Sequence, residues 1–313
     1  MNASDTCGKL GLGKVSREVQ ERSVFPYLPL ADTPRLDGGV VRCHGEIVVA
    51  HSPSIGVPME SLGFFAFHYA ASNVAALFAR PKHLVAGLYL PVGSEVRDLE
   101  TIAGGLGVEA RRYGVTVVAG QTATYAGIEA PLVTATCLGE SVGTPVDPAP
   151  GDAVLVIGEV GGEAAWLKGL SVGVGGDEWR GFTPLPIMLR LQGIDGVTLM
   201  HDISEGGAKR ALLEVSEALG VRLDVATDDV RLAKGVLSLD EDPLRLPTYG
   251  AMIALASSGA REGVEAACGE LGVPCSMVGV VDAGEGLVVD GEAVRRLDRV
   301  DLDWLYGSFS DKR

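Results

Sequence analysis

Cysteine, aromatic residues and positive charge are all scarce in this sequence. The five cysteines are an odd number and include no Cys-x-x-Cys pair, so neither a disulfide framework nor a zinc site is expected. Aromatic residues make up 5% of the chain while 47% of it is apolar, so Val, Leu and Ala must fill most of the core. This composition suits buried strands covered by helices, and it favours an α/β protein with reduced thiols.

Acidic residues outnumber basic ones. The chain contains 26 Lys and Arg against 41 Asp and Glu, which gives a formal net charge of -15. The resulting field repels phosphate backbones and anionic lipid, so we expect no binding to nucleic acid or to a membrane surface. A small phosphorylated molecule is still a plausible partner, because backbone N–H groups can bind phosphate whatever the net charge.

No apolar run is long enough to predict a membrane span. The most apolar stretch, Leu62 to Ala79, contains His68, Ser72 and Asn73 and therefore predicts a buried helix. No basic start followed by an apolar run is present, so a cytoplasmic protein is expected.

The length of 313 residues predicts two domains. A turn-rich stretch with three prolines at 143–152 places the boundary near residue 149, giving domains 1–148 and 149–313. Periodicity predicts helices at 17–24, 62–79, 94–113, 208–219 and 260–271, and strands at 46–51, 84–90, 115–118, 131–138, 153–157, 197–200, 251–256 and 276–281. Both domains are therefore expected to be α/β mixtures.

The most specific motif is His201-Asp202-Ile203-Ser204-Glu205-Gly206-Gly207, between a predicted strand and a helix beginning near Ala208. Unpaired N–H groups at a helix start attract anions, and two glycines leave room for a phosphate to approach. Asp202 and Glu205 are candidate general acid/base groups at this strand end. A purely structural alternative is that Ser204 or Asp202 caps the helix and no ligand is involved.

Further segments match known patterns in the same order. In the second half, Pro150 to Gly158 fits "GD-x-(apolar)-G", 201–207 fits "HD-x-[ST]-x-GG", and Asp242-Pro243-Leu244 with Tyr249-Gly250 fits "DPL…(S/E)-x-G". In the first half, Asn73 with Ala79-Arg80-Pro81 fits "ND-x-(A/L)-x-x-GA-x-P", and Val117 to Thr122 fits "(V/L)-x-GG-D-T". As an ordered set, these segments resemble the aminoimidazole ribonucleotide synthase superfamily, and Gly8-Lys9-Leu10 with Val24-Phe25-Pro26 resembles its HypE-like branch.

The resemblance implies a two-domain PurM-like fold of α/β (α+β) type. Its N-terminal domain would contribute to a β-barrel across a homodimer, and its C-terminal domain would be α/β. The ligand would be ATP or a related nucleotide. The positions that would contact it are Lys9, Asn73, Gly120, Gln121, Thr122, Gly161, Gly162, Ser204, Gly206 and Gly207.

The departures from the family pattern concern the metal. The family holds magnesium with aspartates, because a hard dication needs anionic oxygens. Four of these aspartates align here with Leu36, Ser52, Val74 and Gln121, so Asp37 is the one candidate metal ligand that remains from the set. Magnesium binding is therefore in doubt. A family histidine is replaced by Glu163, and the sequence ends in Ser310 to Arg313 without the terminal cysteine of the HypE-like branch, so chemistry on such a thiol is not expected.

Three functional hypotheses follow. The first is a protein that binds a nucleotide or a phosphorylated metabolite and has a degenerate magnesium site. The second is an active ATP-dependent phosphotransferase or ligase with magnesium held by Asp37, Asp202 and Glu205. The third is a non-catalytic dimeric scaffold, which could pair with an active relative. The sequence does not identify the substrate.

Overall fold

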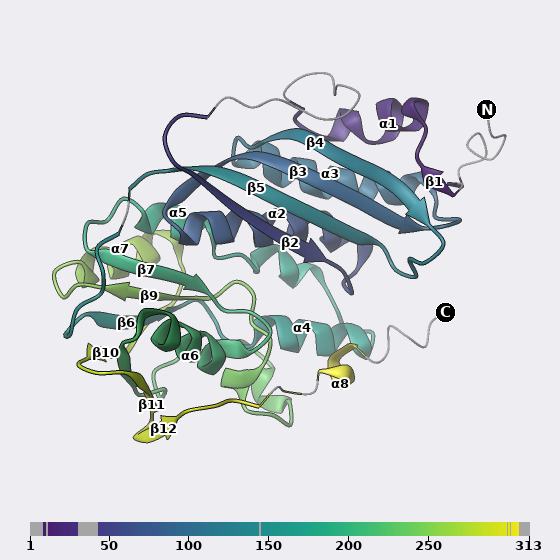
Figure 1. Cartoon of the computed structure of the whole chain (residues 1–313). Coiled ribbons are helices and arrows are strands. Elements are labelled where there is room, and N and C mark those ends of the chain that lie inside the picture. Colours follow the sequence, from purple (N-terminus) through teal and green to yellow (C-terminus); the bar gives the residue numbers. More distant parts are fainter. Residues whose placement is uncertain are drawn as a thin grey trace. The chain divides into compact units, whose positions relative to one another are not determined.

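The computed structural model describes residues 9–10, 12–30, 43–143, 145–298, 300 and 302–306 (Figure 1). These residues form two compact units. The first contains the described residues up to Ala75 together with Ala79–Val142, and the second contains Ala76–Phe78 and the described residues from Gly143 onward. Among the described residues, no helix combines the length and apolar character that a membrane span needs.

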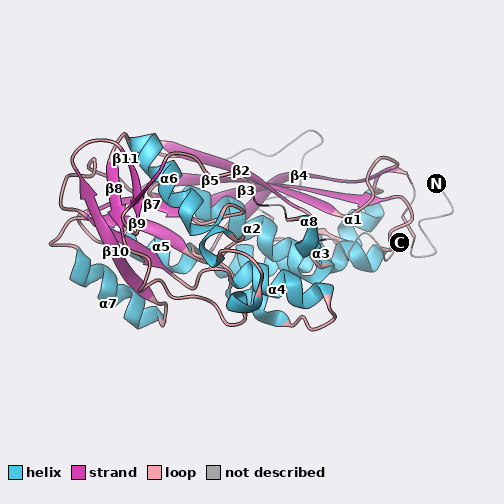
Figure 2. Cartoon of the chain, turned by 90° about the horizontal axis from the view of Figure 1, so that it is seen from below, coloured by secondary structure: helices cyan, strands magenta, loops and turns pink. Residues whose placement is uncertain are grey.

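The first unit is a mixed sheet with its main helices on one face. Its elements are β1 (Gly13–Lys14), α1 (Arg17–Ser23), η2 (Phe25–Tyr27), β2 (Ile47–Ser54), α2 (Met59–Ala76), β3 (Ala79–Pro91), α3 (Val96–Arg112), β4 (Thr116–Tyr125) and β5 (Leu132–Ser141). The described strands lie in the order β1-β4-β3-β5-β2, with β3 and β4 parallel and the other neighbours antiparallel. Figure 2 shows α2 and α3 on the same side of this sheet.

Helix α2 is buried along most of its length because it packs on both the sheet and α3. A side chain at Gly63 would overlap the backbone of α3 at Ile102 and Leu106, so glycine is required for the two helices to approach this closely. The predicted helix over 62–79 is confirmed, but it ends at Ala76 and Ala79 already belongs to β3. The left-handed backbone of Phe78 (φ 54°) makes the turn between the two elements.

The second unit contains a seven-stranded sheet. Its strands are β6 (Ala153–Ile157), β7 (Val197–Asp202), β8 (Arg222–Val225), β9 (Met252–Ala256), β10 (Cys275–Asp282), β11 (Gly286–Val289) and β12 (Glu292–Val294), in the order β12-β11-β8-β10-β6-β9-β7. Its helices are α4 (Gly162–Ser171), α5 (Leu185–Leu191), α6 (Gly207–Leu219), α7 (Arg261–Leu271) and α8 (Asp303–Tyr306), with 3-10 turns η3 (Asp177–Gly181), η4 (Val236–Ser238) and η5 (Pro243–Arg245).

The core of this unit lies on both faces of β6 and β9, in which every residue is buried. Val154 and Ile253 face α6 and belong to its apolar cluster. Figures 1 and 2 together show α6 and α7 on opposite sides of the sheet. The predicted strands and helices of this half are confirmed, whereas β8, β11, β12, α4, α5 and α8 were not predicted from the sequence. Several of these elements are short, and short segments carry little periodicity.

Candidate functional site

A polar pair connects β2 and α2 in the first unit. The side-chain amide of Asn73 (Nδ2) donates a hydrogen bond to Ser52 Oγ at 3.3 Å, and both residues are half-buried. An amide and a hydroxyl can bind an anion or water through hydrogen bonds, but they lack the anionic oxygens that Mg²⁺ prefers. The structure thus brings together two positions that the sequence assigned to the metal and nucleotide site.

Asn73, and not Val74, takes the place of the aspartate in the family's "ND" motif. Val74 is fully buried, and its Cγ1 lies where a side chain on Gly139 of β5 would be, so it belongs to the core. Counting back from Pro81 with the spacing of the motif also reaches Asn73. By the spacing of the motif, the aspartate that was aligned with Val74 corresponds instead to Asn73, and both members of the pair Ser52–Asn73 are neutral residues.

The candidate residues of β4 are divided between the two faces of the sheet. The pairing of β2, β5, β3 and β4 places Ser52, Gly120 and Thr122 on one face, and Thr122 is buried there. Gln121 points to the other face because side chains alternate along a strand. Within the first unit, Gln121 therefore does not join the pair Ser52–Asn73.

The other nucleotide-binding and metal-binding candidates of the first unit form no metal site within the described residues. Lys9 is exposed and forms a backbone bridge with Glu95. Asp37 and Leu36 lie outside the described residues. Among the residues that are described, no group of three or more His, Cys, Asp or Glu side chains could hold a metal ion.

The glycine turn of the motif joins β7 to α6 in the second unit. Gly207 has a left-handed backbone (φ 68°), and its N–H already donates to the Ser204 carbonyl at 3.0 Å. A Cβ at Gly207 would lie 2.5 Å from the carbonyl oxygen of Leu244 and 2.8 Å from Arg245 Cα. Backbone conformation and close packing on η5 therefore require glycine at this position, and its N–H is not free for the phosphate that the sequence predicted there.

A cavity of about 290 Å³ lies beside this turn. Its lining includes Ser204, Glu205 and Gly206 of the motif. Arg210 and Arg245 also line it, and each donates one hydrogen bond, of 2.7 Å and 2.8 Å, to backbone carbonyls in the segment that precedes α8. A guanidinium has five N–H donors, so both arginines keep donors that could bind an anion.

Asp202 ends β7 and does not line this cavity. Burial raises the pKa of its carboxyl, and the nearby His201 ring, whose Nδ1 lies 4.0 Å from Asp202 Oδ1, opposes that rise. The other ring nitrogen of His201 lies 3.3 Å from Glu214 Oε2. The three side chains form a carboxyl–imidazole–carboxylate series that could move a proton. This geometry is compatible with the acid/base role predicted for Asp202.

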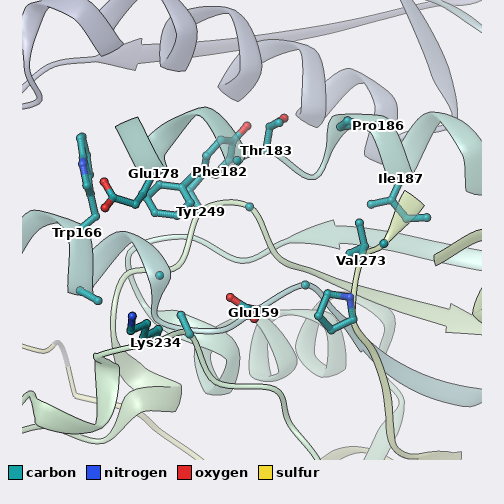
Figure 3. A pocket seen from close by; sticks show the side chains of 18 of the residues that line it. Glu159, Trp166, Glu178, Phe182, Thr183, Pro186, Ile187, Lys234, Tyr249 and Val273 are labelled. Carbon is teal, nitrogen blue, oxygen red and sulfur yellow. The ribbon is translucent and has the colours of Figure 1, made fainter. Parts of the chain in front are cut away.

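A larger cavity of about 640 Å³ lies in the second unit, where β6 ends and β9 and β10 begin (Figure 3). Its aromatic wall is made of Trp166, Phe182 and Tyr249. The Trp166 and Phe182 rings meet edge to face at 6.0 Å between centroids, and the Trp166 Nε1 donates to the Gly176 carbonyl. Both contacts fix the orientation of the indole. A cavity of this size with rigid aromatic walls is typical of a small-molecule site.

The polar groups of this larger cavity are few. Lys234 is its one lysine or arginine, and Glu159 and Glu178 are its carboxylates. Figure 3 shows Lys234 and Glu159 on the side opposite Thr183. Gly162, the first residue of α4, also lines the cavity, so a helix start, with its partial positive charge, borders it.

Sequence reasoning found one part of this cavity and missed the rest. Gly161 and Gly162 were predicted to contact a nucleotide, and Gly162 does line the cavity. Gly161 instead donates its N–H to Thr248 Oγ1 at 2.7 Å, which anchors the loop. The aromatic wall comes from α4, from the residue after η3 and from a loop before β9, so no local pattern indicates that these residues meet.

Comparison with known proteins places the chain among relatives of this fold. Residues 36–141 match the family "AIR synthase related protein, N-terminal domain", and residues 149–292 match "AIR synthase related protein, C-terminal domain". The carbamoyl dehydratase HypE of Azotobacter vinelandii is 28% identical over 286 residues, covering 84% of this chain and 83% of that protein. The thiamine-monophosphate kinase of Pyrococcus horikoshii is 26% identical over 242 residues, covering 71% of each chain.

Solved structures agree with this placement at the level of the fold. The crystal structure of the hydrogenase maturation protein HypE in complex with ATP superposes with a TM-score of 0.75 at 21% identity, covering 94% of this chain and 98% of that one. The two-domain PurM-like fold expected from the sequence is thereby confirmed. The chain belongs to the AIR synthase related protein family, in its HypE-like branch.

Proposed function

We propose that this protein binds an ATP-type nucleotide or a related phosphorylated metabolite, with the ring in the larger cavity of the second unit. The observation that carries the proposal is the cavity itself. Its volume and its wall of Trp166, Phe182 and Tyr249 suit a planar ring. Lys234 and the start of α4 supply positive charge for a phosphate, and membership in a family that includes an ATP-bound HypE supports the same ligand class.

The second part of the proposal is that magnesium contributes little to this binding. Ser52 and Asn73 supply neutral atoms where family members have carboxylates, and Gln121 does the same on β4. Without carboxylates at these positions of the first unit, a dication gains little by binding there. These positions of the first unit are therefore degenerate with respect to the metal, while they keep hydrogen-bond donors.

Calorimetric titration with ATP, in magnesium and in a chelator, tests both parts. We expect binding with similar affinity in the two buffers. Lys234→Gln should weaken binding by about tenfold, equivalent to about 1.4 kcal/mol, because a charge-assisted contact to phosphate is lost. The matched control is Lys82→Gln, an exposed lysine on β3, which should bind ATP like the parent. Absence of ATP binding, or equal effects of the two substitutions, would contradict the proposal.

An active ATP-dependent phosphotransferase is the second candidate. The observation that favours it is the series Asp202, His201 and Glu214, in which burial raises the pKa of a carboxyl at a strand end. Such a perturbed group beside a glycine turn is a candidate general acid or base. A phosphate-release assay distinguishes this candidate, because turnover that disappears in Asp202→Asn, with the fold intact, would support it.

We further propose that the first unit pairs with a second copy of the chain. Val49 of β2 is 57% exposed, and it shares the sheet face opposite α2 with Leu138, Val85 and Tyr89. Among the described strands, β2 has a neighbour on one side only. This face also carries His51 and Thr136, so it is partly apolar, and an exposed sheet face that ends in an open edge favours association between copies. Pairing with an active relative would use the same face.

A further inference from the structure

The smaller cavity, beside the glycine turn, is lined by two arginines that come from different elements. Arg210 lies near the start of α6, and Arg245 is the last residue of η5. Both side chains are half-buried, and both line the cavity of about 290 Å³. The fold therefore brings two positive charges to one small space, although the two residues are distant in the sequence.

These two arginines differ from most others of the second unit in having no carboxylate partner. A carboxylate oxygen lies within 4.0 Å of a guanidinium nitrogen at Arg180, Arg190, Arg222, Arg261 and Arg296. Among the described residues, Arg210 and Arg245 each have a single polar partner, which is the backbone carbonyl of Leu297 or Asp298, respectively. A neutral carbonyl compensates a half-buried positive charge less well than an anion does. Both guanidiniums can therefore gain from binding an anion.

Three acidic residues also line this cavity, and two of them interact with other side chains. Glu214 Oε2 lies 3.3 Å from His201 Nε2. Asp298 Oδ1 lies 3.7 Å from Arg296, where both side chains are almost fully exposed. Glu205 is exposed to solvent. The carboxylates of Glu214 and Asp298 are thus directed to partners other than the two cavity arginines.

Gly206 provides the space that the Arg210 side chain occupies. A Cβ at Gly206 would lie 2.4 Å from Arg210 Cγ and 2.5 Å from Arg210 Cβ. The backbone of Gly206 has φ -83°, which any residue can adopt, so packing and not conformation favours glycine here. The first glycine of the motif therefore has a role that the sequence did not indicate, because it accommodates an arginine of the cavity.

We propose that Arg210 and Arg245 bind a phosphate group in this smaller cavity, as inorganic phosphate or as part of a small phosphorylated metabolite. Two guanidinium forks match the several oxygens of a phosphate, and a phosphate charge of about -1.5 to -2 balances two arginines better than a single carboxylate does. Ligand sites have volumes of about 300 Å³ or more, so this cavity suits a small anion better than a whole nucleotide. It shares no lining residue with the larger cavity, and the proposal does not depend on what binds there.

Calorimetric titration of the full-length protein with sodium phosphate, at constant ionic strength, tests the site. The titrations use Lys234→Gln as the background, so that the lysine of the larger cavity does not contribute. We expect one phosphate per chain, bound at least about tenfold more weakly, or by about 1.4 kcal/mol, after Arg210→Gln or Arg245→Gln. The matched control is Arg261→Gln, which changes an α7 arginine paired with Glu265 and should bind phosphate like the background protein. Absence of phosphate binding, or equal effects of the three substitutions, would overturn the proposal.

Two further titrants identify the form of the ligand. Glycerol 3-phosphate that binds more tightly than inorganic phosphate would indicate a phosphorylated metabolite, and the reverse order would indicate the free ion. Acetate should bind more weakly than either, because it carries one charge and two oxygens. Acetate binding as tight as that of phosphate would contradict the assignment of a phosphate site.

Modification of the unsubstituted protein by phenylglyoxal, which reacts with arginine side chains, tests the site without relying on the folding of a variant. Peptide mass spectrometry measures the rate at each arginine. Phosphate should slow the reaction of Arg210 and Arg245 several-fold and leave that of Arg261 unchanged. If phosphate does not slow the reaction at Arg210 and Arg245, these arginines only anchor the backbone at Leu297 and Asp298, and the proposal is wrong.

Discussion

Placing carboxylates at Ser52 and Asn73 should create a magnesium response that we do not expect of the parent protein. In the structure Asn73 Nδ2 lies 3.3 Å from Ser52 Oγ, so Ser52→Asp combined with Asn73→Asp would place two carboxylates close together. Two like charges about 4 Å apart repel by about 4 kcal/mol at an effective dielectric constant of about 20, and by less here because water reaches both half-buried side chains. Without metal, the double variant should therefore unfold more easily than the parent.

Magnesium should reverse this loss, because a dication between two carboxylates converts repulsion into attraction. A ligand present at about 100 times its Kd stabilises the folded state by about 2.7 kcal/mol. For a unit of this size, such a gain corresponds to a rise in Tm of about 5 °C or more. Differential scanning calorimetry of the double variant, in magnesium and in a chelator, measures this rise.

The controls separate charge from packing. Ser52→Asp alone adds one carboxylate and should respond weakly, and Ser52→Asn adds bulk without charge and should not respond. If the double variant folds but its Tm does not change with magnesium, Ser52 and Asn73 do not lie where two carboxylates could bind the ion, and the prediction is refuted. A rise of several degrees in the Tm of the parent protein on adding magnesium would also refute the prediction, because the parent protein would then bind the ion without these carboxylates.

Three further outcomes are expected. Burial lowers the pKa of His68, whose Nε2 lies 3.1 Å from Glu109 Oε2, so the unfolded chain binds a proton below about pH 6.5 that the folded protein does not. The free energy of unfolding should therefore decrease as the pH is lowered below about 6.5, by up to about 1.4 kcal/mol per pH unit. Denaturation of His68→Gln should lack this slope. Gly207→Ala should lower the free energy of unfolding more than Gly220→Ala in denaturant titrations. Both glycines have positive φ, but only at Gly207 would the added Cβ also overlap neighbouring backbone. Equal losses of unfolding free energy would contradict this prediction. Light scattering should return the mass of a dimer at micromolar concentration and a smaller mass for Val49→Glu, and a monomeric parent would refute the sheet-face pairing.

The local sequence pattern was sufficient for most regular elements. β6 and β9 are continuous apolar runs that read as buried strands, and α3 and α6 carry clear apolar stripes. Gly220 was expected to end α6 and does so with a left-handed backbone. β4 was predicted over 115–118 but extends to Tyr125, since its polar and glycine residues gain strand geometry only from pairing with β3.

The candidate site was only partly predictable. The motif at 201–207 located the strand end and the glycine turn, because strand, turn and helix follow one another in sequence. The sequence could not distinguish a glycine kept for phosphate from one kept for packing, and the backbone of Leu244 and Arg245 gives Gly207 a packing role. Likewise, the motif alignment assigned Val74 to a ligand position, whereas in the structure Val74 is buried in the core and Asn73 is the residue that contacts Ser52.

By itself, the sequence determined the α/β class and the ordered motifs that reveal the family, because composition, periodicity and spacing are properties of the chain. Only the tertiary structure decided which of these residues meet. Trp166, Phe182 and Tyr249 form one wall although up to 83 residues separate them, and Asn73 of α2 donates a hydrogen bond to Ser52 of β2. Such contacts depend on how strands and helices pack over long distances in the chain, and no local periodicity encodes that packing.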